Sequence, residues 1–229
     1  MSASNITVYF LGASRAIRAT WLLEELGLPY NLVSEDRAAN RLASPEVQAK
    51  IPAPLKKSPT IKDGDTVVQE SGAIMDMTPR ASCSRDPDVR AKTREWVHAA
   101  EGVFMLHGLA VLYARWTIPE NAKSAALPEM EKKLAVNVHK DLDWVEEHVR
   151  KQGTKFLMGD AVSVADIMMQ FSIELIYVSK LGVSAEEVGE TGGDGRWPLT
   201  KQWLGRCMST PSFTKAVKKS GYSLESFRN

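Results

Sequence analysis

The sequence predicts a small α/β region followed by an all-helical region, and three observations carry this prediction. Residues 6–33 show two short alternating strand patterns with a helical pattern between them. Residues 59–69 show the pattern of a β-hairpin. After the proline-containing stretch 79–88, apolar residues recur only at helical spacing. We therefore expect two domains, at residues 1–80 and 88–229.

The first elements form a strand–helix–strand unit. Residues 6–10 alternate in polarity, and Ser14 follows a Gly-Ala pair where it can cap a helix over 15–26. Pro29 prevents the helix from continuing, and residues 30–33 form a second short strand. Because a helix separates the two strands, we expect them to be parallel.

The rest of the first region predicts a short helix, a hairpin and a further helix. A helix is expected near 45–50, and strands at 59–61 and 66–69 flank an Asp-Gly turn signal. Pro59 stands at the start of its strand, one of the few strand positions that tolerate proline. A last helix is expected at about 71–77, which gives the order β-α-β-(α)-β-β-α.

The second region predicts only helices. The expected spans are 89–116, 129–151, 163–180, 198–209 and 211–220. Ile118-Pro119 breaks the pattern after the first of them, and residues 187–197 are rich in glycine. Ser163 and Asp166 have the spacing of a capping box, which we interpret as structural.

Composition excludes several classes of function. The 29 basic and 28 acidic residues give a net charge of +1, which argues against a nucleic-acid or membrane-surface partner. No apolar run approaches the roughly 18–20 residues of a membrane span. The first residues, MSASNITVYFLGAS, lack a basic region and a long apolar region, so we do not expect a secretory signal. The two cysteines, Cys83 and Cys207, show no paired spacing, so we expect free thiols and a cytoplasmic setting. The four histidines show no metal-binding spacing, so no metal is expected.

Four segments together resemble one family. They are SRAIRATWLLEELGLPY (14–30), APLKKSPTI (53–61), VVQESGAI (67–74) and FLMGDAVSVAD (156–166). In this order and at these separations they resemble the cytosolic glutathione transferases, most closely the fungal and bacterial subgroup. The resemblance implies a thioredoxin-like, glutathione-binding N-terminal domain and an all-α C-terminal domain that forms the second-substrate pocket. It also implies glutathione as co-substrate and a homodimer.

The resemblance assigns glutathione-binding roles to five residues. In such proteins the proline matching Pro59 is cis, and the backbone of the preceding residue, here Ser58, pairs with the cysteinyl part of glutathione. The acid and hydroxyl matching Glu70 and Ser71 hold the γ-glutamyl end. Lys57 would pair with the glycyl carboxylate.

Two residues compete for activation of the thiol. Ser14 lies four residues before Arg18, as the active serine of serine-type classes lies before a helical arginine. Tyr9 is the alternative, because tyrosine-type classes place their hydroxyl at the end of the first strand. Arg15 would either lower the thiol pKa or bind an acidic second substrate.

The remaining assignments concern the second substrate and two departures from the family pattern. Met105, Tyr113 and Trp116 are expected in an apolar pocket on the helix at 89–116. Lys56 stands where the family has a loop glycine, which puts the turn and the role of its neighbour Lys57 in question. Pro79 should end the helix after the Glu-Ser pair early, in a segment that carries part of the family's dimer contact.

The predicted function is conjugation of the glutathione thiolate to a small, largely apolar electrophile, in detoxification or secondary metabolism. Two alternatives stay open. One is a specialised pathway enzyme that adds, eliminates or isomerises with glutathione. The other is a glutathione-fold protein that binds or regulates without catalysis.

Overall fold

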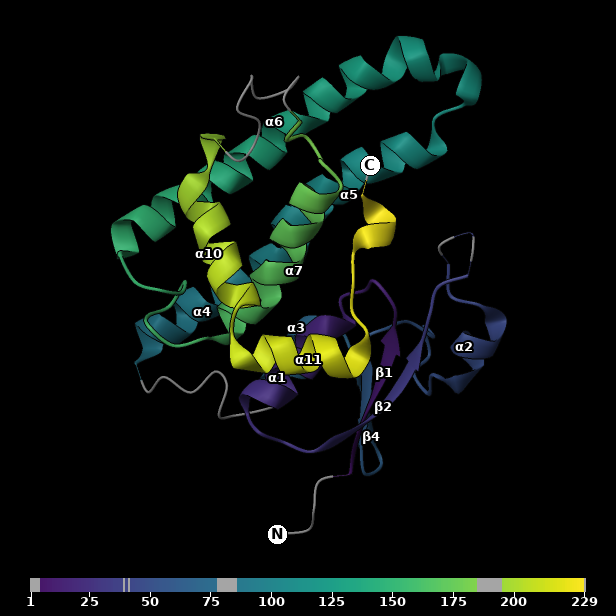
Figure 1. Cartoon of the computed structure of the whole chain (residues 1–229), viewed down its shortest axis with the longest axis vertical. Coiled ribbons are helices and arrows are strands. Elements are labelled where there is room, and N and C mark those ends of the chain that lie inside the picture. Colours follow the sequence, from purple (N-terminus) through teal and green to yellow (C-terminus); the bar gives the residue numbers. More distant parts are fainter. Residues whose placement is uncertain (1–4, 39, 41, 78–85, 185–194, 229) are drawn as a thin grey trace. The chain divides into compact units, whose positions relative to one another are not determined.

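The computed structural model describes residues 5–38, 40, 42–77, 86–184 and 195–228 (Figure 1). The chain divides into two compact units. The first consists of residues 1–93 and 208–226, and the second of residues 94–207 and 227–229.

The sheet of the first unit has four strands in the order β2-β1-β3-β4. They are β1 (Ile6–Leu11), β2 (Tyr30–Glu35), β3 (Thr60–Asp63) and β4 (Thr66–Gln69). The prediction that the first two strands are parallel is confirmed, with Ile6 opposite Tyr30. β3 runs antiparallel to both β1 and β4, so the predicted hairpin is also confirmed.

Helices cover both faces of this sheet. α1 (Ala16–Glu25) and α3 (Ser71–Asp76) lie on one side and α2 (Pro45–Lys50) on the other (Figure 1). The face under α1 is apolar because Ile6, Val8 and Phe10 alternate along β1 and are buried.

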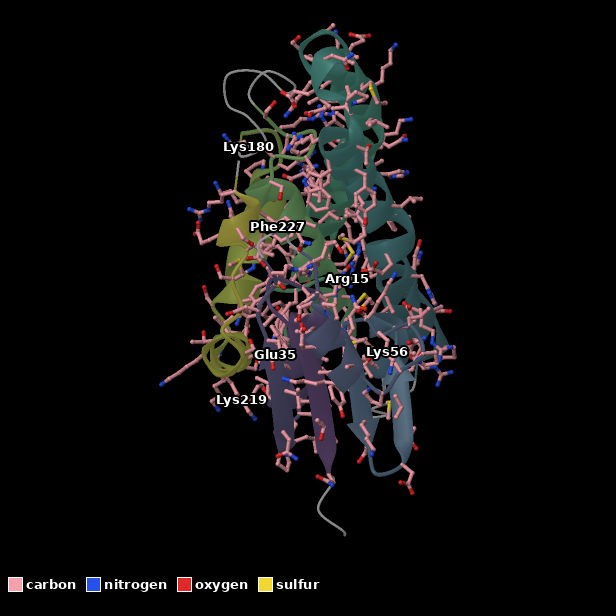
Figure 2. The ribbon with its side chains drawn as sticks, turned by 90° about the vertical axis from the view of Figure 1, so that its right-hand side faces the viewer. Arg15, Glu35, Lys56, Lys180, Lys219 and Phe227 are labelled. Carbon is pink, nitrogen blue, oxygen red and sulfur yellow. The ribbon has the colours of Figure 1, made fainter. Side chains whose placement is uncertain are left out.

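A fourth helix of the first unit comes from the end of the chain. α11 (Pro211–Ser220) packs along α1, where the Trp21 indole donates to the Ser212 hydroxyl at 3.0 Å. The edge of the Phe213 ring faces Trp21, with ring centroids 5.1 Å apart. Lys219, on the helix seen nearly end-on in Figure 2, donates to the Tyr30 carbonyl at 3.0 Å. The predicted second domain, 88–229, therefore differs from the second compact unit, because residues 208–226 pack with the first.

The second unit is helical, as the sequence predicted. The chain continues through α4 (Pro87–Ala99), the π-helical stretch η1 (Ala100–Met105), α5 (Leu106–Thr117), α6 (Glu120–Gln152), α7 (Val164–Val178) and α10 (Pro198–Met208), and a short 3₁₀ turn, η2 (Glu225–Phe227), lies near its end. The predicted single helix at 89–116 is thus interrupted by a π-helical stretch of six residues. The predicted start of the next helix at 129 is wrong, because α6 begins at Glu120 and continues through Pro128. Proline disfavours a helix interior, yet α6 continues through the exposed Pro128, and its buried residues begin only at Ala135.

One stretch of the described residues meets the length and composition test for a membrane span. It is Pro87–Thr117, with a mean hydropathy of 1.3 in its most apolar window, of which 44% is buried. This differs from the expectation that no such run exists. Core helices of globular proteins pass the same test, and Trp96, Phe104 and Val111 are buried.

The predicted capping box at the start of α7 is confirmed and extends into a buried network around Asp166. Its carboxylate accepts from the Ser163 backbone N–H at 2.9 Å and the Ser163 hydroxyl at 2.6 Å. It also accepts from the Leu157 N–H at 2.8 Å and the Trp203 indole at 2.9 Å. Burial raises the pKa of Asp166, and these hydrogen bonds act in the opposite direction. One carboxylate thus joins α7, the loop before it and α10.

Asp166→Ala should lower the free energy of unfolding by about 3 kcal/mol, because it leaves several buried donors without an acceptor. Denaturant unfolding of the whole chain measures this. Asp160→Ala is the matched control, since Asp160 is exposed and, among the described residues, accepts only from the Lys155 N–H in the same loop. Equal losses in the two variants would contradict the structural role given to Asp166.

Candidate functional site

The register of the sheet gathers four predicted site residues at one end of the first unit. Thr60 pairs with Gln69, so Ser58, just before β3, lies at the same end as Glu70 and Ser71, just after β4. Tyr9 pairs with Thr60, so the end of β1 and the Ser14 that follows it reach the same place. These residues therefore form one candidate site within the first unit.

Ser58 closes the β1–β3 ladder with its side chain. Two further steps of the register would place Ser58 opposite Leu11, and there the Ser58 hydroxyl accepts the Leu11 N–H at 3.0 Å. The same hydroxyl donates to the Tyr9 carbonyl at 3.0 Å. The Ser58–Pro59 bond is cis. Among the described residues, the backbone N–H and C=O of Ser58 pair with no other group. The side chain of Ser58 thus makes the hydrogen bonds to β1 that its main chain would make in a regular ladder. The main-chain N–H and C=O of Ser58 therefore stay available for a ligand.

Ser14 is buried, with 5% of its surface exposed, next to Ser58. Its hydroxyl accepts from the Ala16 N–H at 3.2 Å and lies 3.5 Å from the Ser58 hydroxyl. Because Ser58 already donates to Tyr9, Ser14 is the donor between the two hydroxyls. That bond is at the long limit for a hydrogen bond, so redirecting the Ser14 proton to another acceptor costs little. α1 begins one residue later than predicted, and Arg15 is its N-cap.

Glu70 and Ser71 link the end of β4 to α3. Glu70 is exposed and has φ 73° and ψ 122°, a backbone conformation that residues other than glycine rarely adopt. Ser71 is buried, and its hydroxyl accepts from a guanidinium nitrogen of Arg18 at 3.4 Å. Arg18 is itself fully buried in α1. The sequence pointed to Arg18 only as a spacing marker, whereas the structure connects it to Ser71.

Lys56 adopts a backbone conformation that favours glycine, the residue that the resemblance led us to expect at this position. Its φ is 51°, in the left-handed region that favours glycine, and its N–H closes a turn onto the Ala53 carbonyl at 3.1 Å. The Lys56 ammonium (Figure 2) donates to the Ile51 carbonyl at 2.8 Å. Lys57 is exposed, and no described residue pairs with its ammonium. Lys56 therefore takes part in the turn, whereas the Lys57 ammonium pairs with no described residue.

The structure adds a residue that sequence reasoning missed. Arg37, two residues after β2, donates to the Gly12 carbonyl at 2.8 Å and to the Ala13 carbonyl at 3.2 Å. Both carbonyls belong to the loop that leads to Ser14. The pKa of Arg37 is lowered by burial and by the nearby charge of Arg15. Arg37 lies in a polar stretch without periodicity, so no pattern in the sequence pointed to it.

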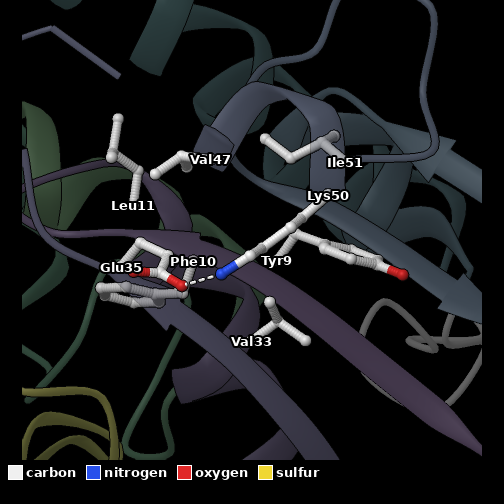
Figure 3. Close-up of a pocket in the computed structure, with 8 residues that line it drawn as sticks. All are labelled: Tyr9, Phe10, Leu11, Val33, Glu35, Val47, Lys50 and Ile51. Carbon is white, nitrogen blue, oxygen red and sulfur yellow. Dashed lines mark hydrogen bonds and ion pairs between the residues drawn. The ribbon is translucent and has the colours of Figure 1, made fainter. Parts of the chain in front are cut away.

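Tyr9 lines a small pocket on the α2 side of the sheet. Val33, Val47 and Ile51 line the same pocket, and an ion pair between Lys50 and Glu35 spans it (Figure 3). In Figure 3 the Tyr9 hydroxyl points away from Glu35. The Tyr9 carbonyl, by contrast, contacts Ser58. Tyr9 is thus joined to the candidate site through its backbone.

The three predicted pocket residues of the second unit have different environments. Met105 is buried at the end of the π-helical stretch. Tyr113 and Trp116 on α5 are 51% and 47% exposed, and their ring centroids are 5.8 Å apart. The Trp116 ring also approaches Phe227, with centroids 6.3 Å apart. Two exposed aromatic rings on one helix face offer an apolar surface.

Several other titratable groups among the described residues lie outside the candidate site, in the packed interior or in ion pairs. Burial raises the pKa of the Cys207 thiol well above its usual value, which makes it a poor nucleophile. His107 contacts Asp141 at 2.7 Å. The pKa of Asp141 is raised, because the effect of burial exceeds the opposing effect of His107. No three His, Cys, Asp or Glu side chains in the described ranges gather where they would hold a metal ion. Cys83 and Pro79 lie outside the described residues.

Comparison with known families gives matches in both halves of the chain. The model described as "Glutathione S-transferase, N-terminal domain" matches residues 4–76. The model described as "Glutathione S-transferase, C-terminal domain" matches residues 106–211. Together these matches cover more than half of the chain.

A curated relative has similar length. The chain is 25% identical to Glutathione S-transferase 1 of Saccharomyces cerevisiae over 241 aligned positions, which cover 96% of the chain and 97% of that protein. It is also 25% identical to Glutathione S-transferase 3 of Schizosaccharomyces pombe, over 73% of each protein.

Solved structures share the fold across both units. A glutathione S-transferase from Actinobacillus pleuropneumoniae matches with a TM-score of 0.75 at 24% identity, over 96% of this chain and 94% of that one. Ure2p in complex with glutathione matches with a TM-score of 0.71 at 18% identity, over 94% of this chain and 100% of that one.

Lys56→Gly should leave the free energy of unfolding unchanged or raise it by up to about 1 kcal/mol, because glycine adopts positive φ without steric cost. Lys57→Gly is the matched control in the same loop. It should lower the free energy by about 0.4–1 kcal/mol, since it only adds freedom to the unfolded chain. Chemical denaturation of both variants measures the difference. A larger loss for Lys56→Gly than for Lys57→Gly would contradict the strain at Lys56.

Proposed function

The chain belongs to the glutathione transferase family, and on this premise we propose that it joins the thiolate of glutathione to a small, largely apolar electrophile. The observation that carries the proposal is the end of the sheet where Ser14, the unpaired backbone of Ser58, Glu70 and Ser71 meet. A hydroxyl, a free peptide group and a carboxylate are the groups that a short, charged, thiol-bearing peptide requires.

Ser58, Glu70 and Ser71 would bind glutathione by its main-chain and charged groups. The backbone of Ser58 offers one donor and one acceptor, as a strand edge does for an added strand. The Glu70 carboxylate would accept from the ammonium of the γ-glutamyl end, and the Ser71 hydroxyl would hold its carboxylate. Buried Arg18 donates to Ser71 and favours negative charge beside it. Lys57 would pair with the glycyl carboxylate.

Ser14 would activate the thiol. Glutathione, when bound, supplies a thiolate that attacks an electrophilic carbon. A free thiol has a pKa of about 8.5, so the protein must favour its anion near neutral pH. The Ser14 hydroxyl can exchange its 3.5 Å contact with Ser58 for donation to the sulfur, while the Ala16 N–H continues to hold its oxygen. Arg15, as N-cap of α1, adds a positive charge close by.

The second substrate would bind on apolar and aromatic side chains. Tyr113 and Trp116 expose their rings on α5, and Met105 lies buried just before the start of this helix. This composition favours a largely apolar electrophile, as expected for detoxification or secondary metabolism.

Family membership also supports a cytoplasmic homodimer with no nucleic-acid or membrane partner. The near-zero net charge of +1 agrees with this proposal, because both excluded partners need a basic surface. Analytical sedimentation tests the dimer, which requires a mass of two chains.

Retention on immobilised glutathione followed by conjugation of a generic aryl halide tests the function. The wild-type chain should be retained and should turn over. Ser14→Ala should remain bound but lose about 100-fold in turnover near neutral pH, since it removes the donor to the thiolate. Tyr9→Phe should keep its rate, because the Tyr9 hydroxyl lies on the α2 side of the sheet.

Other outcomes separate the alternatives. Retention without turnover of any electrophile would favour a binding or regulatory protein. Loss of rate in Tyr9→Phe alone would transfer the activating role to Tyr9. Neither retention nor turnover would overturn the proposed function.

Glu70→Gln should weaken glutathione binding about 10- to 100-fold, because it removes the charge from a charge-assisted hydrogen bond. Asp65→Asn is the control, since Asp65 is an exposed acid in the turn at the other end of the same hairpin. Isothermal titration with glutathione measures both affinities. Equal affinities for glutathione in the two variants would show that Glu70 does not take part in binding.

A further inference from the structure

The loop between β1 and α1 is held by hydrogen bonds from neighbouring elements. The Gly12 N–H donates to the Glu35 carbonyl at 2.8 Å. A Cβ at Gly12 would lie 3.1 Å from Asp36 Oδ1, a close contact that a small shift of this exposed side chain would relieve. Ala13 follows with φ 51°, in the left-handed region that costs a residue other than glycine roughly 1–2 kcal/mol. This loop therefore needs support to keep its shape.

Arg37 supplies that support. Its Nε donates to the Gly12 carbonyl at 2.8 Å and its Nη2 to the Ala13 carbonyl at 3.2 Å. The planar guanidinium thereby joins two successive carbonyls, which a single ammonium cannot do with the same geometry. These carbonyls flank the strained Ala13, and the next residue is Ser14. Because Ser14 follows Ala13 directly, a rotation of the Ala13 backbone would displace the Ser14 hydroxyl, which now lies 3.5 Å from that of Ser58.

We propose that Arg37 is a positioning residue for thiol activation, which holds the Gly12 and Ala13 carbonyls and so keeps the Ser14 hydroxyl in place for the sulfur. This inference rests on the proposed function of the same site. Arg37 acts through the loop, whereas Ser14 would contact the sulfur.

The charges around the loop reinforce this role. Arg15 and Arg37 lie close enough for the charge of Arg15 to lower the pKa of Arg37, together with burial. Two acids also face the loop from the end of β2. Glu35 forms an ion pair with Lys50, and Asp36 is exposed beside Gly12. With Glu35 paired to Lys50, the charged groups around the loop include two guanidiniums and one further carboxylate, that of Asp36, and the guanidiniums favour a thiolate.

Two substitutions separate geometry from charge. Arg37→Gln removes both the charge and the guanidinium that donates to the two carbonyls. Arg37→Lys keeps the charge but not the guanidinium. Arg37→Gln should lower turnover about tenfold at about pH 6.5 and raise the pKa of the bound thiol by about one unit, so the loss narrows at higher pH. Arg37→Lys should restore part of the loss. In both variants the Gly12 amide should exchange its hydrogen faster than in the wild type, as judged by NMR.

Arg206→Gln is the matched control, because Arg206 in the second unit also donates to a backbone carbonyl, that of Lys155 at 2.8 Å. It should change neither the pH profile nor Gly12 exchange. A loss in Arg37→Gln that is equal at all pH values, or Gly12 exchange at the wild-type rate, would overturn the inference. If the wild type fails to bind glutathione, the proposed function fails, and Gly12 exchange alone then decides whether Arg37 holds the loop.

Discussion

The hydroxyl of Ser58 is the interaction on which the candidate site depends. In a regular ladder the main chain of Ser58 would pair with Leu11, and none of its peptide groups would remain for a ligand. Because the side chain accepts the Leu11 N–H and donates to the Tyr9 carbonyl, the sheet is closed while the main chain stays unpaired. The same oxygen accepts a hydrogen bond from the Ser14 hydroxyl. The Ser58 hydroxyl therefore leaves the Ser58 main chain unpaired among the described residues, and it also orients the Ser14 hydroxyl that would donate to the sulfur.

Backbone strain concentrates around this end of the sheet. Among the described residues, four other than glycine have positive φ, and three of them, Ala13, Lys56 and Glu70, lie in loops that meet there. Each is held by its surroundings: Ala13 by Arg37, Lys56 by its bond to Ile51, and Glu70 by the start of α3. Strained residues persist where packing and hydrogen bonds determine them, and such places are often binding sites. The three loops thus behave as one preorganised surface.

Much of this could be predicted from the sequence, and the limits have physical causes. Pro59 and the Glu70–Ser71 pair stand in short motifs between strands whose alternation is plain, so their meeting at one sheet end follows from the register. Arg37 acts through long-range bonds from an irregular stretch, which no local pattern encodes. The side-chain role of Ser58 depends on a hydroxyl that reaches across the sheet. The expected helix start at 129 is wrong, because α6 begins at Glu120 and passes through the exposed Pro128, where no buried contact accounts for the continuation.

The position of α11 has a consequence for how the protein is made. Trp21 and Tyr30 of the first unit pack against residues between 208 and 226, although more than a hundred residues of the second unit separate them along the chain. Those residues leave the ribosome only after the second unit has been synthesised. During translation the apolar side of α1 therefore stays uncovered while the second unit emerges, so the first unit cannot complete its packing before that point.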